Sequence, residues 1–417
     1  MGPRVLSERV SLVRRGFLIG AMLAVFAVSW GDARAQESSE TRLVAYYLAY
    51  NIYDEQYFVT DIPGQLLTHL NYGYVDISDN LQCTSADAWA DTDFAYPGDR
   101  QTERVRGNFK QLQLLREQYP DLKILMSIGG WEHSANFSEA ALSEESRVRL
   151  VRSCLAFMRE YGFDGIDIDW RYPVVGGATP DSARPEDSSN LTLLMADFRG
   201  QIEYWSEQDD QRYLLTMAVS GSESLYSSVQ LNLVQEDVDW FNLLSFGFYG
   251  SWSPITSHFA GLYRNPRDPE SADAYTVDAA VNAFLDAGVP AQKIVLGVPF
   301  YAQTWRNVRP NDYFGLFQPT EGVPSGTRAG GTLNYQDLEA FLSSPAYIRF
   351  FDDEAKAAWM YNADRRIAIS YENEASILLK MAYVQNMGLG GAVVWELAFD
   401  DDAHTLLRAA HEGLLGP

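Results

Sequence analysis

The sequence has few of the residues that build metal centres and disulfide frameworks. It contains two cysteines, Cys83 and Cys154, and five histidines that stand singly. No Cys-x-x-Cys pair occurs, so we predict no metal site and no cofactor. Cys154 lies in an apolar helical pattern, which favours a buried thiol, and a disulfide with Cys83 is the alternative after export.

Basic residues are also scarce. Lysine and arginine number 32 against 56 aspartates and glutamates, which gives a formal net charge of −24 at pH 7. Such a chain repels nucleic acid, so we expect no nucleic-acid partner. The acidic surface is either an ordinary solvated face or an adaptation to a salt-rich habitat, and it carries no information about catalysis.

The apolar run near the N-terminus, residues 17–30, is shorter than the ~20 residues that a membrane-spanning helix needs. It follows the pair Arg14-Arg15 and precedes Ala33-Arg34-Ala35, which offers a small-residue cleavage site. We predict a twin-arginine-type signal peptide over residues 1–35 and a secreted or periplasmic mature chain over 36–417, without membrane contact. A membrane anchor is the alternative.

Short apolar stretches alternate with helical patterns along the mature chain. Parallel strands need crossover helices and are apolar on both faces, so this alternation predicts a parallel α/β fold. Periodicity alone leaves a closed barrel and a doubly wound sheet open. The predicted strands are 43–48, 70–75, 123–131, 163–173, 213–219, 240–246, 293–299 and 390–395. Residues 78–100 are predicted to be a surface connection.

One segment interrupts the alternation. Residues 301–371 lie between the seventh predicted strand and its helix. A connection of this length is expected to have secondary structure of its own.

The fourth predicted strand, 163–173, carries three carboxylates among apolar residues. Side chains two positions apart share a face of a strand, so Asp167, Asp169 and Arg171 point the same way. Charges that face a core are costly unless they line a site, and perturbed charged groups cluster at functional positions. We therefore predict a site at the end of this strand. An internal salt-bridge cluster is the alternative.

This strand resembles the Asp-x-x-Asp-x-Asp-x-Glu signature of glycoside hydrolase family 18, the chitinases and their relatives. Asp164, Asp167 and Asp169 match the signature, and Arg171 stands where the signature has Glu. The resemblance covers residues 43–414. It implies a (β/α)8 TIM barrel in which residues 301–371 form a small α+β insertion domain beside a sugar cleft. The implied ligand is chitin or another N-acetylated glycan.

The resemblance also implies a reaction. Active relatives use the N-acetyl carbonyl of the substrate as nucleophile while the Glu protonates the leaving oxygen, and Asp169 would orient the acetamido group. A guanidinium stays protonated, so Arg171 has no proton to lend. A positioned acid contributes roughly 10²–10⁴-fold to the rate.

Three further positions depart from the family pattern. The Tyr-Asp pair of the sixth strand is Phe246-Gly247, and the Arg that follows the seventh strand is Gln303. Because these departures accompany Arg171, we predict a pseudoenzyme that binds a glycan without hydrolysing it.

Aromatic residues remain at the family positions that line the sugar cleft. The predicted substrate-binding residues are Tyr46, Tyr74, Trp131, Tyr301 and Trp395, with Tyr50 and Trp252 at the rim. Packing within the barrel is the alternative role for these rings.

Two other functions stay open. One is an active glycosidase with a relocated acid at Glu132, Glu223 or Glu396, each of which follows a predicted strand. The other is a protein-interaction scaffold whose cleft is plugged by Arg171.

Overall fold

The computed structural model describes residues 41–100, 102, 105–177, 183–269 and 275–416. The predicted signal peptide lies outside these residues. Among the helices of the described ranges, none is long and apolar enough to cross a membrane.

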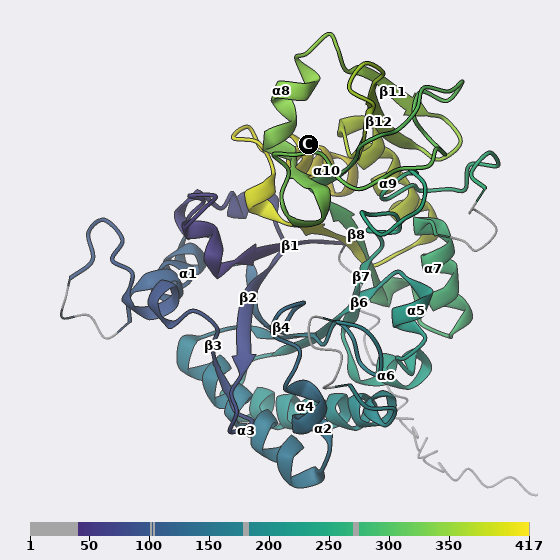
Figure 1. Cartoon of the computed structure of the whole chain (residues 1–417). Coiled ribbons are helices and arrows are strands. Elements are labelled where there is room, and N and C mark those ends of the chain that lie inside the picture. The colour runs from purple at the N-terminus through teal and green to yellow at the C-terminus, as the bar shows by residue number, and fades with distance from the viewer. Residues whose placement is uncertain (1–40, 101, 103–104, 178–182, 270–274, 417) are drawn as a thin grey trace, which may run out of the picture. The chain divides into compact units, whose positions relative to one another are not determined.

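A closed barrel of parallel strands forms the centre of the molecule. The strand order is β1-β14-β8-β7-β6-β5-β4-β2, and β2 pairs again with β1, which closes the barrel. Figure 1 shows β1, β2 and β4 on one side of the ring and β6, β7 and β8 on the other. The barrel strands are β1 (Arg42–Leu48), β2 (His69–Ile77), β4 (Lys123–Gly129), β5 (Gly165–Asp169), β6 (Leu214–Ser220), β7 (Trp240–Leu244), β8 (Ile294–Pro299) and β14 (Gly391–Trp395). The predicted TIM barrel is confirmed.

Helices cover the outside of the barrel. α3 (Glu144–Tyr161) begins at Ser143, whose hydroxyl accepts from the backbone N–H of Ser146, and ends at Gly162, whose φ of 79° suits glycine. Its apolar face is buried, as amphipathic periodicity predicts. The other longer helices are α1 (Gly107–Gln118), α4 (Asp187–Asp209), α6 (Leu231–Asp237), α7 (Val277–Asp286), α9 (Glu374–Met387) and α10 (Thr405–Leu415).

The predicted insertion domain is confirmed as a second, antiparallel sheet. Its strand order is β10-β9-β13-β12-β11, and it has a hydrophobic cluster of its own that includes Leu338, Met360 and Ile369. The strands are β9 (Tyr301–Trp305), β10 (Thr332–Asn334), β11 (Ile348–Asp352), β12 (Ala357–Asn362) and β13 (Ile367–Tyr371).

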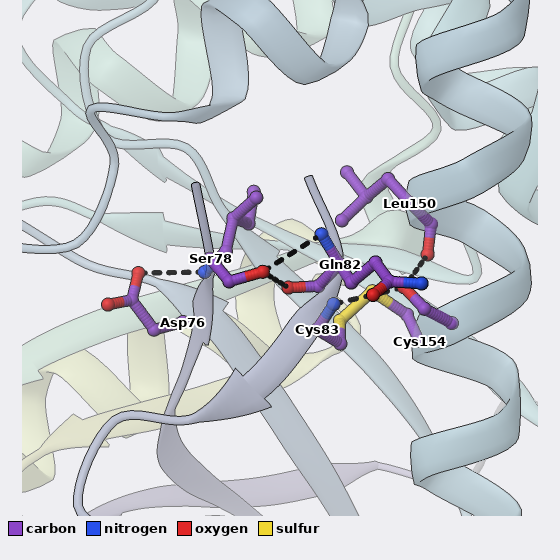
Figure 2. Close-up of a disulfide and its surroundings, with 8 residues drawn as sticks. Asp76, Ser78, Gln82, Cys83, Leu150 and Cys154 are labelled. Atoms are coloured by element: carbon purple, nitrogen blue, oxygen red, sulfur yellow. Dashed lines mark hydrogen bonds between the residues drawn. A yellow bond between two sulfur atoms is a disulfide. The ribbon is translucent and has the colours of Figure 1, made fainter. Parts of the chain in front are cut away.

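Cys83 and Cys154 form a disulfide, which is the alternative that the sequence left open for this pair. The segment predicted as a surface connection folds back as β3 (Cys83–Ser85), which pairs antiparallel with the end of β2. This brings Cys83 against α3, with 5.0 Å between the two Cα atoms, and its N–H donates to the Ser153 hydroxyl at 3.0 Å (Figure 2). The bond closes a loop with a sequence separation of 71, which stabilises the fold by about 4 kcal/mol in the chain-entropy model.

The same segment also enters the core. Asp91 is fully buried and accepts hydrogen bonds from the hydroxyls of Tyr72 and Ser85. A surface connection would have left this carboxylate in solvent, so the prediction for residues 78–100 is corrected here as well.

Glu396 connects the first and last strands of the barrel. It follows β14 and is fully buried, and its carboxylate accepts a hydrogen bond of 2.8 Å from the side-chain amide of Asn51, which follows β1. Burial raises the pKa of Glu396 to about 8, and the hydrogen bond from Asn51 only partly opposes this effect.

We predict that Glu396 makes stability fall as pH rises from about 5 to 8. In this window the folded protein keeps the proton that the unfolded chain, with a carboxyl pKa near ~4.3, has lost. Glu396→Gln retains the acceptor for Asn51 and should remove this part of the slope, roughly 1.4 kcal/mol per pH unit. Urea unfolding of both proteins at several pH values measures the difference. If the free energy of unfolding changed with pH by the same amount in both proteins, Glu396 would not be the source of the slope.

Candidate functional site

Asp167 lies inside the barrel and is fully buried. Four neutral groups from four other strands donate to its carboxylate. They are the Tyr46 hydroxyl at 2.7 Å, the Ser127 hydroxyl at 2.8 Å, the Thr216 hydroxyl at 2.6 Å and the Asn242 amide at 3.0 Å.

The strand register explains this cluster. Ser127 on β4 and Thr216 on β6 are the direct partners of Asp167 on β5, so their side chains share one layer of the barrel interior. The sequence prediction missed Ser127, Thr216 and Asn242. In each case, the sequence signal that could have identified the residue was one polar side chain inside an otherwise apolar strand.

Burial raises the pKa of Asp167, and the hydrogen bond from Thr216 opposes this effect. Burial, reinforced by the charge of Asp167, also raises the pKa of Tyr46. Tyr46 therefore stays a neutral donor, and the cluster holds Asp167 rigidly below the end of β5.

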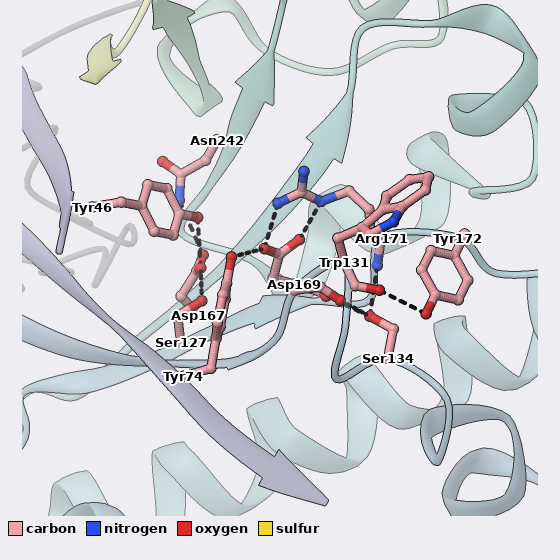
Figure 3. A network of polar contacts seen from close by, with 11 residues as sticks. Tyr46, Tyr74, Ser127, Trp131, Ser134, Asp167, Asp169, Arg171, Tyr172 and Asn242 are labelled. Carbon is pink, nitrogen blue, oxygen red and sulfur yellow. Dashed lines mark hydrogen bonds and ion pairs between the residues drawn. The ribbon is translucent and has the colours of Figure 1, made fainter. Parts of the chain in front are cut away.

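Arg171 forms a two-pronged ion pair with Asp169. Its Nε donates to Oδ1 at 2.8 Å and its Nη2 donates to Oδ2 at 2.7 Å, while the Tyr74 hydroxyl donates to Oδ2 at 3.2 Å (Figure 3). The Asp169 side chain is 0% exposed and that of Arg171 is 14% exposed. The internal salt bridge, predicted as the alternative for this strand, is present, although Arg171 lies beyond the end of β5.

The charge on Arg171 is fixed. Burial lowers its pKa, but the attraction of Asp169 outweighs burial and raises the pKa above its ordinary value. Arg171 is therefore a cation throughout the working pH range. Both oxygens of Asp169 face it, so the carboxylate is neutralised.

Arg171 also lies over Trp395 at the end of β14. Its guanidinium carbon is 5.1 Å from the centre of the Trp395 ring, within the range of a cation–π interaction. The ring of Tyr46 lies 4.7 Å from that of Trp395. The partly buried Trp395 ring therefore has one neighbour that is charged and one that is aromatic.

Trp131 is half exposed, at 46%, and is held beside Arg171 (Figure 3). Its carbonyl accepts from the Tyr172 hydroxyl at 2.8 Å, and the two rings lie edge to face at 5.4 Å. The Ser134 hydroxyl donates to the Asp169 carbonyl at 3.0 Å and accepts from the Arg171 N–H at 3.2 Å. These bonds fix the loop after β4 to the end of β5.

Asp164 lies away from this group. It precedes β5, at the opposite end of the strand, and accepts from the Ile124 N–H at 2.9 Å and from Arg116 at 3.1 Å. These partners give Asp164 a structural role at the bottom of the barrel.

Other predicted residues are largely buried. Tyr46 is fully buried and Tyr74 is 8% exposed, as the alternative role of packing within the barrel requires. Gln303 is buried in the insertion domain, where its amide donates to the Gly330 carbonyl at 2.9 Å. Tyr301 is partly buried and packs edge to face against Phe246 at 6.0 Å.

The three candidate replacement acids are placed differently. Glu132 and Glu223 are exposed, whereas Glu396 is buried and bonded to Asn51. Within the described ranges, none of the three makes a hydrogen bond to Asp169 or Arg171. The same part of the chain contains no group of three His, Cys, Asp or Glu side chains that could hold a metal ion.

Comparison with known proteins identifies relatives of the whole barrel. The chain is 34% identical to Chitinase A1 of Niallia circulans over 92% of its own length, and it spans 60% of the length of that relative. The solved structure of chitinase ChiA74 from Bacillus thuringiensis has a TM-score of 0.85 at 31% identity, over 90% of this chain and 70% of that one. A Group IV chitinase of Ostrinia furnacalis, solved in complex with allosamidin, has a TM-score of 0.78 at 27% identity, over 90% and 100%.

These relatives are named as chitinases, so the comparisons favour the alternative of an active glycosidase over the predicted absence of hydrolysis. The family model of the glycosyl hydrolases family 18 matches residues 42–400. With this match over most of its length, the chain belongs to glycosyl hydrolase family 18.

Proposed function

We propose that this protein binds chitin or a related N-acetylated glycan and does not hydrolyse it by the acid-assisted route of its family. The observation that carries the proposal is the ion pair between Arg171 and Asp169. On this proposal, Arg171 occupies the position of the family's catalytic Glu.

The ion pair removes two requirements of the reaction. A proton donor must reach the leaving oxygen, and Arg171 remains protonated while making its bonds to Asp169. A carboxylate must also face the developing positive charge of the substrate, and both oxygens of Asp169 are already bonded. A fixed cation beside that developing charge raises the barrier further.

Binding is supported by the aromatic residues that remain accessible. Trp131 is 46% exposed and is fixed by Tyr172, and Tyr50 and Trp252 are 50% and 70% exposed. Relatives named as chitinases, and the complex of one of them with allosamidin, support a glycan as the ligand class. Because Arg171 lies over Trp395, we infer that the sugar contacts Trp131 and leaves the Trp395 ring to Arg171.

Calorimetry with an N-acetylglucosamine hexamer tests binding directly. We expect binding by the wild type and at least a tenfold weaker affinity for Trp131→Ala, because the lost ring contact is worth about 1.4 kcal/mol. Tyr204→Ala is the matched control, since Tyr204 is equally exposed, at 50%, but lies on the outer helix α4. An assay of reducing ends on the same samples should detect no release. Absence of binding by the wild type would contradict the proposal and favour the scaffold hypothesis.

An active glycosidase is the second candidate, and the names of the relatives favour it. It needs an acid other than Arg171, and Glu132 and Glu223 are the exposed carboxylates available after β4 and β6. Release of reducing ends by the wild type, abolished by Glu132→Gln or Glu223→Gln, would establish this second candidate.

Restoring the family residues separates the two candidates in another way. Arg171→Glu alone should give little turnover, because the Phe246 ring has no hydroxyl for the acetamido group and Gly247 has no carboxylate. Adding Phe246→Tyr should raise turnover by about 10²-fold over the single variant, whereas Gly247 has a φ of 74°, at which an aspartate would be strained. Initial rates on the hexamer measure both. Full family-level turnover in Arg171→Glu alone would show that the other two positions do not matter.

A further inference from the structure

A pocket of about 320 Å³ lies between the insertion domain and the segment around Arg267, and it shares no residue with the site around Asp169. Three aromatic rings form one wall, and charged side chains surround its opening. We call it the aromatic pocket; its lining residues include Arg267, Asp312, Phe314, Phe350, Asp353, Glu354 and Trp359. Figure 1 shows β11 and β12, the strands that carry two of the rings.

The aromatic wall is a continuous stack. Phe350 on β11 and Trp359 on β12 are direct partners across the strand pair, with ring centres 5.0 Å apart. Phe314 also stacks on Phe350, with the centres of the two rings 4.4 Å apart. Trp359 is 8% exposed and Phe314 is 47% exposed, so the stack leads from the core to an open outer ring.

The backbone holds Phe314 in this outward position. Phe314 and Phe317 both have left-handed backbone conformations, with φ of 49° and 58°, which cost roughly 1–3 kcal/mol each for bulky residues. The side chain of Asn311 compensates, because it accepts from the Gly315 N–H and donates to the Leu316 carbonyl, both at 2.8 Å. The exposed ring is therefore fixed before any ligand arrives.

The charges at the opening are unbalanced. Asp312, Asp353 and Glu354 are exposed, and no ion pair engages them within the part of the chain that the structure describes. Arg267 is the one cation among the lining residues, and its guanidinium lies over the Tyr313 ring at 5.2 Å. Three carboxylates against one guanidinium leave the opening attractive to a cation.

We propose that the aromatic pocket binds a sugar unit that carries a protonated amine, such as a glucosamine unit of partly deacetylated chitin. The apolar face of the sugar ring would lie on Phe314, and the ammonium group would lie near Asp353 and Glu354. An ammonium group is attracted both by the π face of an aromatic ring and by carboxylates. A volume of about 320 Å³ is at the small end of ligand sites, which suits one or two sugar units.

This second site goes beyond the proposed function, because it shares no residue with the site around Asp169 and takes a cationic ligand. Its test therefore starts from the Trp131→Ala protein, in which the barrel site is weakened. Loss of binding at the aromatic pocket can then be distinguished from loss of binding at the barrel.

Calorimetry with a glucosamine tetramer, at a pH at which its amines are protonated, measures the proposed binding. We expect binding by the Trp131→Ala protein that weakens as salt is raised from 50 to 500 mM. Adding Phe314→Ala should weaken it at least tenfold. Adding Asp353→Asn with Glu354→Gln should do the same, and we expect this variant to fold because both side chains are exposed. Adding Tyr204→Ala, on α4, should leave binding unchanged.

Three results would overturn the proposal. The first is that the Trp131→Ala protein does not bind the glucosamine tetramer, and the second is that neither the Phe314 nor the carboxylate substitutions weaken its binding. The third is that the N-acetylglucosamine tetramer binds at this pocket as tightly as the glucosamine tetramer. The carboxylate variant keeps the test decisive if Phe314→Ala does not fold.

Discussion

The functional end of the barrel depends on the ion pair between Arg171 and Asp169. A carboxylate as deeply buried as Asp169 costs several kcal/mol unless a cation and hydrogen bonds compensate it. The Tyr74 hydroxyl, at 3.2 Å, is its other side-chain donor among the described residues. Arg171 thus stabilises the buried charge of Asp169. The same guanidinium covers Trp395, so one side chain changes the charge and the accessible surface of the site together.

Asp167 and Asp169 lie on the same strand, but their carboxylates have different surroundings. Asp167 is surrounded by neutral donors, and its burial raises its pKa. Asp169, two residues further along, faces a permanent cation. Both lie on the interior face of β5, so the difference comes from their neighbours: hydroxyls and an amide in the layer of Asp167, and Arg171 beyond the end of the strand.

Local patterns predicted the barrel strands, because these depend on periodicity, whereas the closed barrel and the α+β insertion domain followed from the family resemblance. Contacts between distant segments could not be predicted in this way. Cys83 reaches Cys154 because β3 folds back onto α3. Tyr46 matched a sugar-contacting position, but it is fully buried in an apolar cluster of the barrel interior and donates to Asp167. The aromatic pocket joins segments around residues 267, 314 and 350, whose proximity no local pattern indicates.

Family membership and the geometry of the site favour different activities, and one structure of a complex decides between them. The most direct measurement is a crystal structure of the wild-type protein soaked with an N-acetylglucosamine hexamer. We expect an intact oligosaccharide on Trp131, with Arg171 still paired to Asp169 and covering Trp395. A cleaved product, or a sugar ring on Trp395 with Arg171 displaced from Asp169, would contradict this expectation.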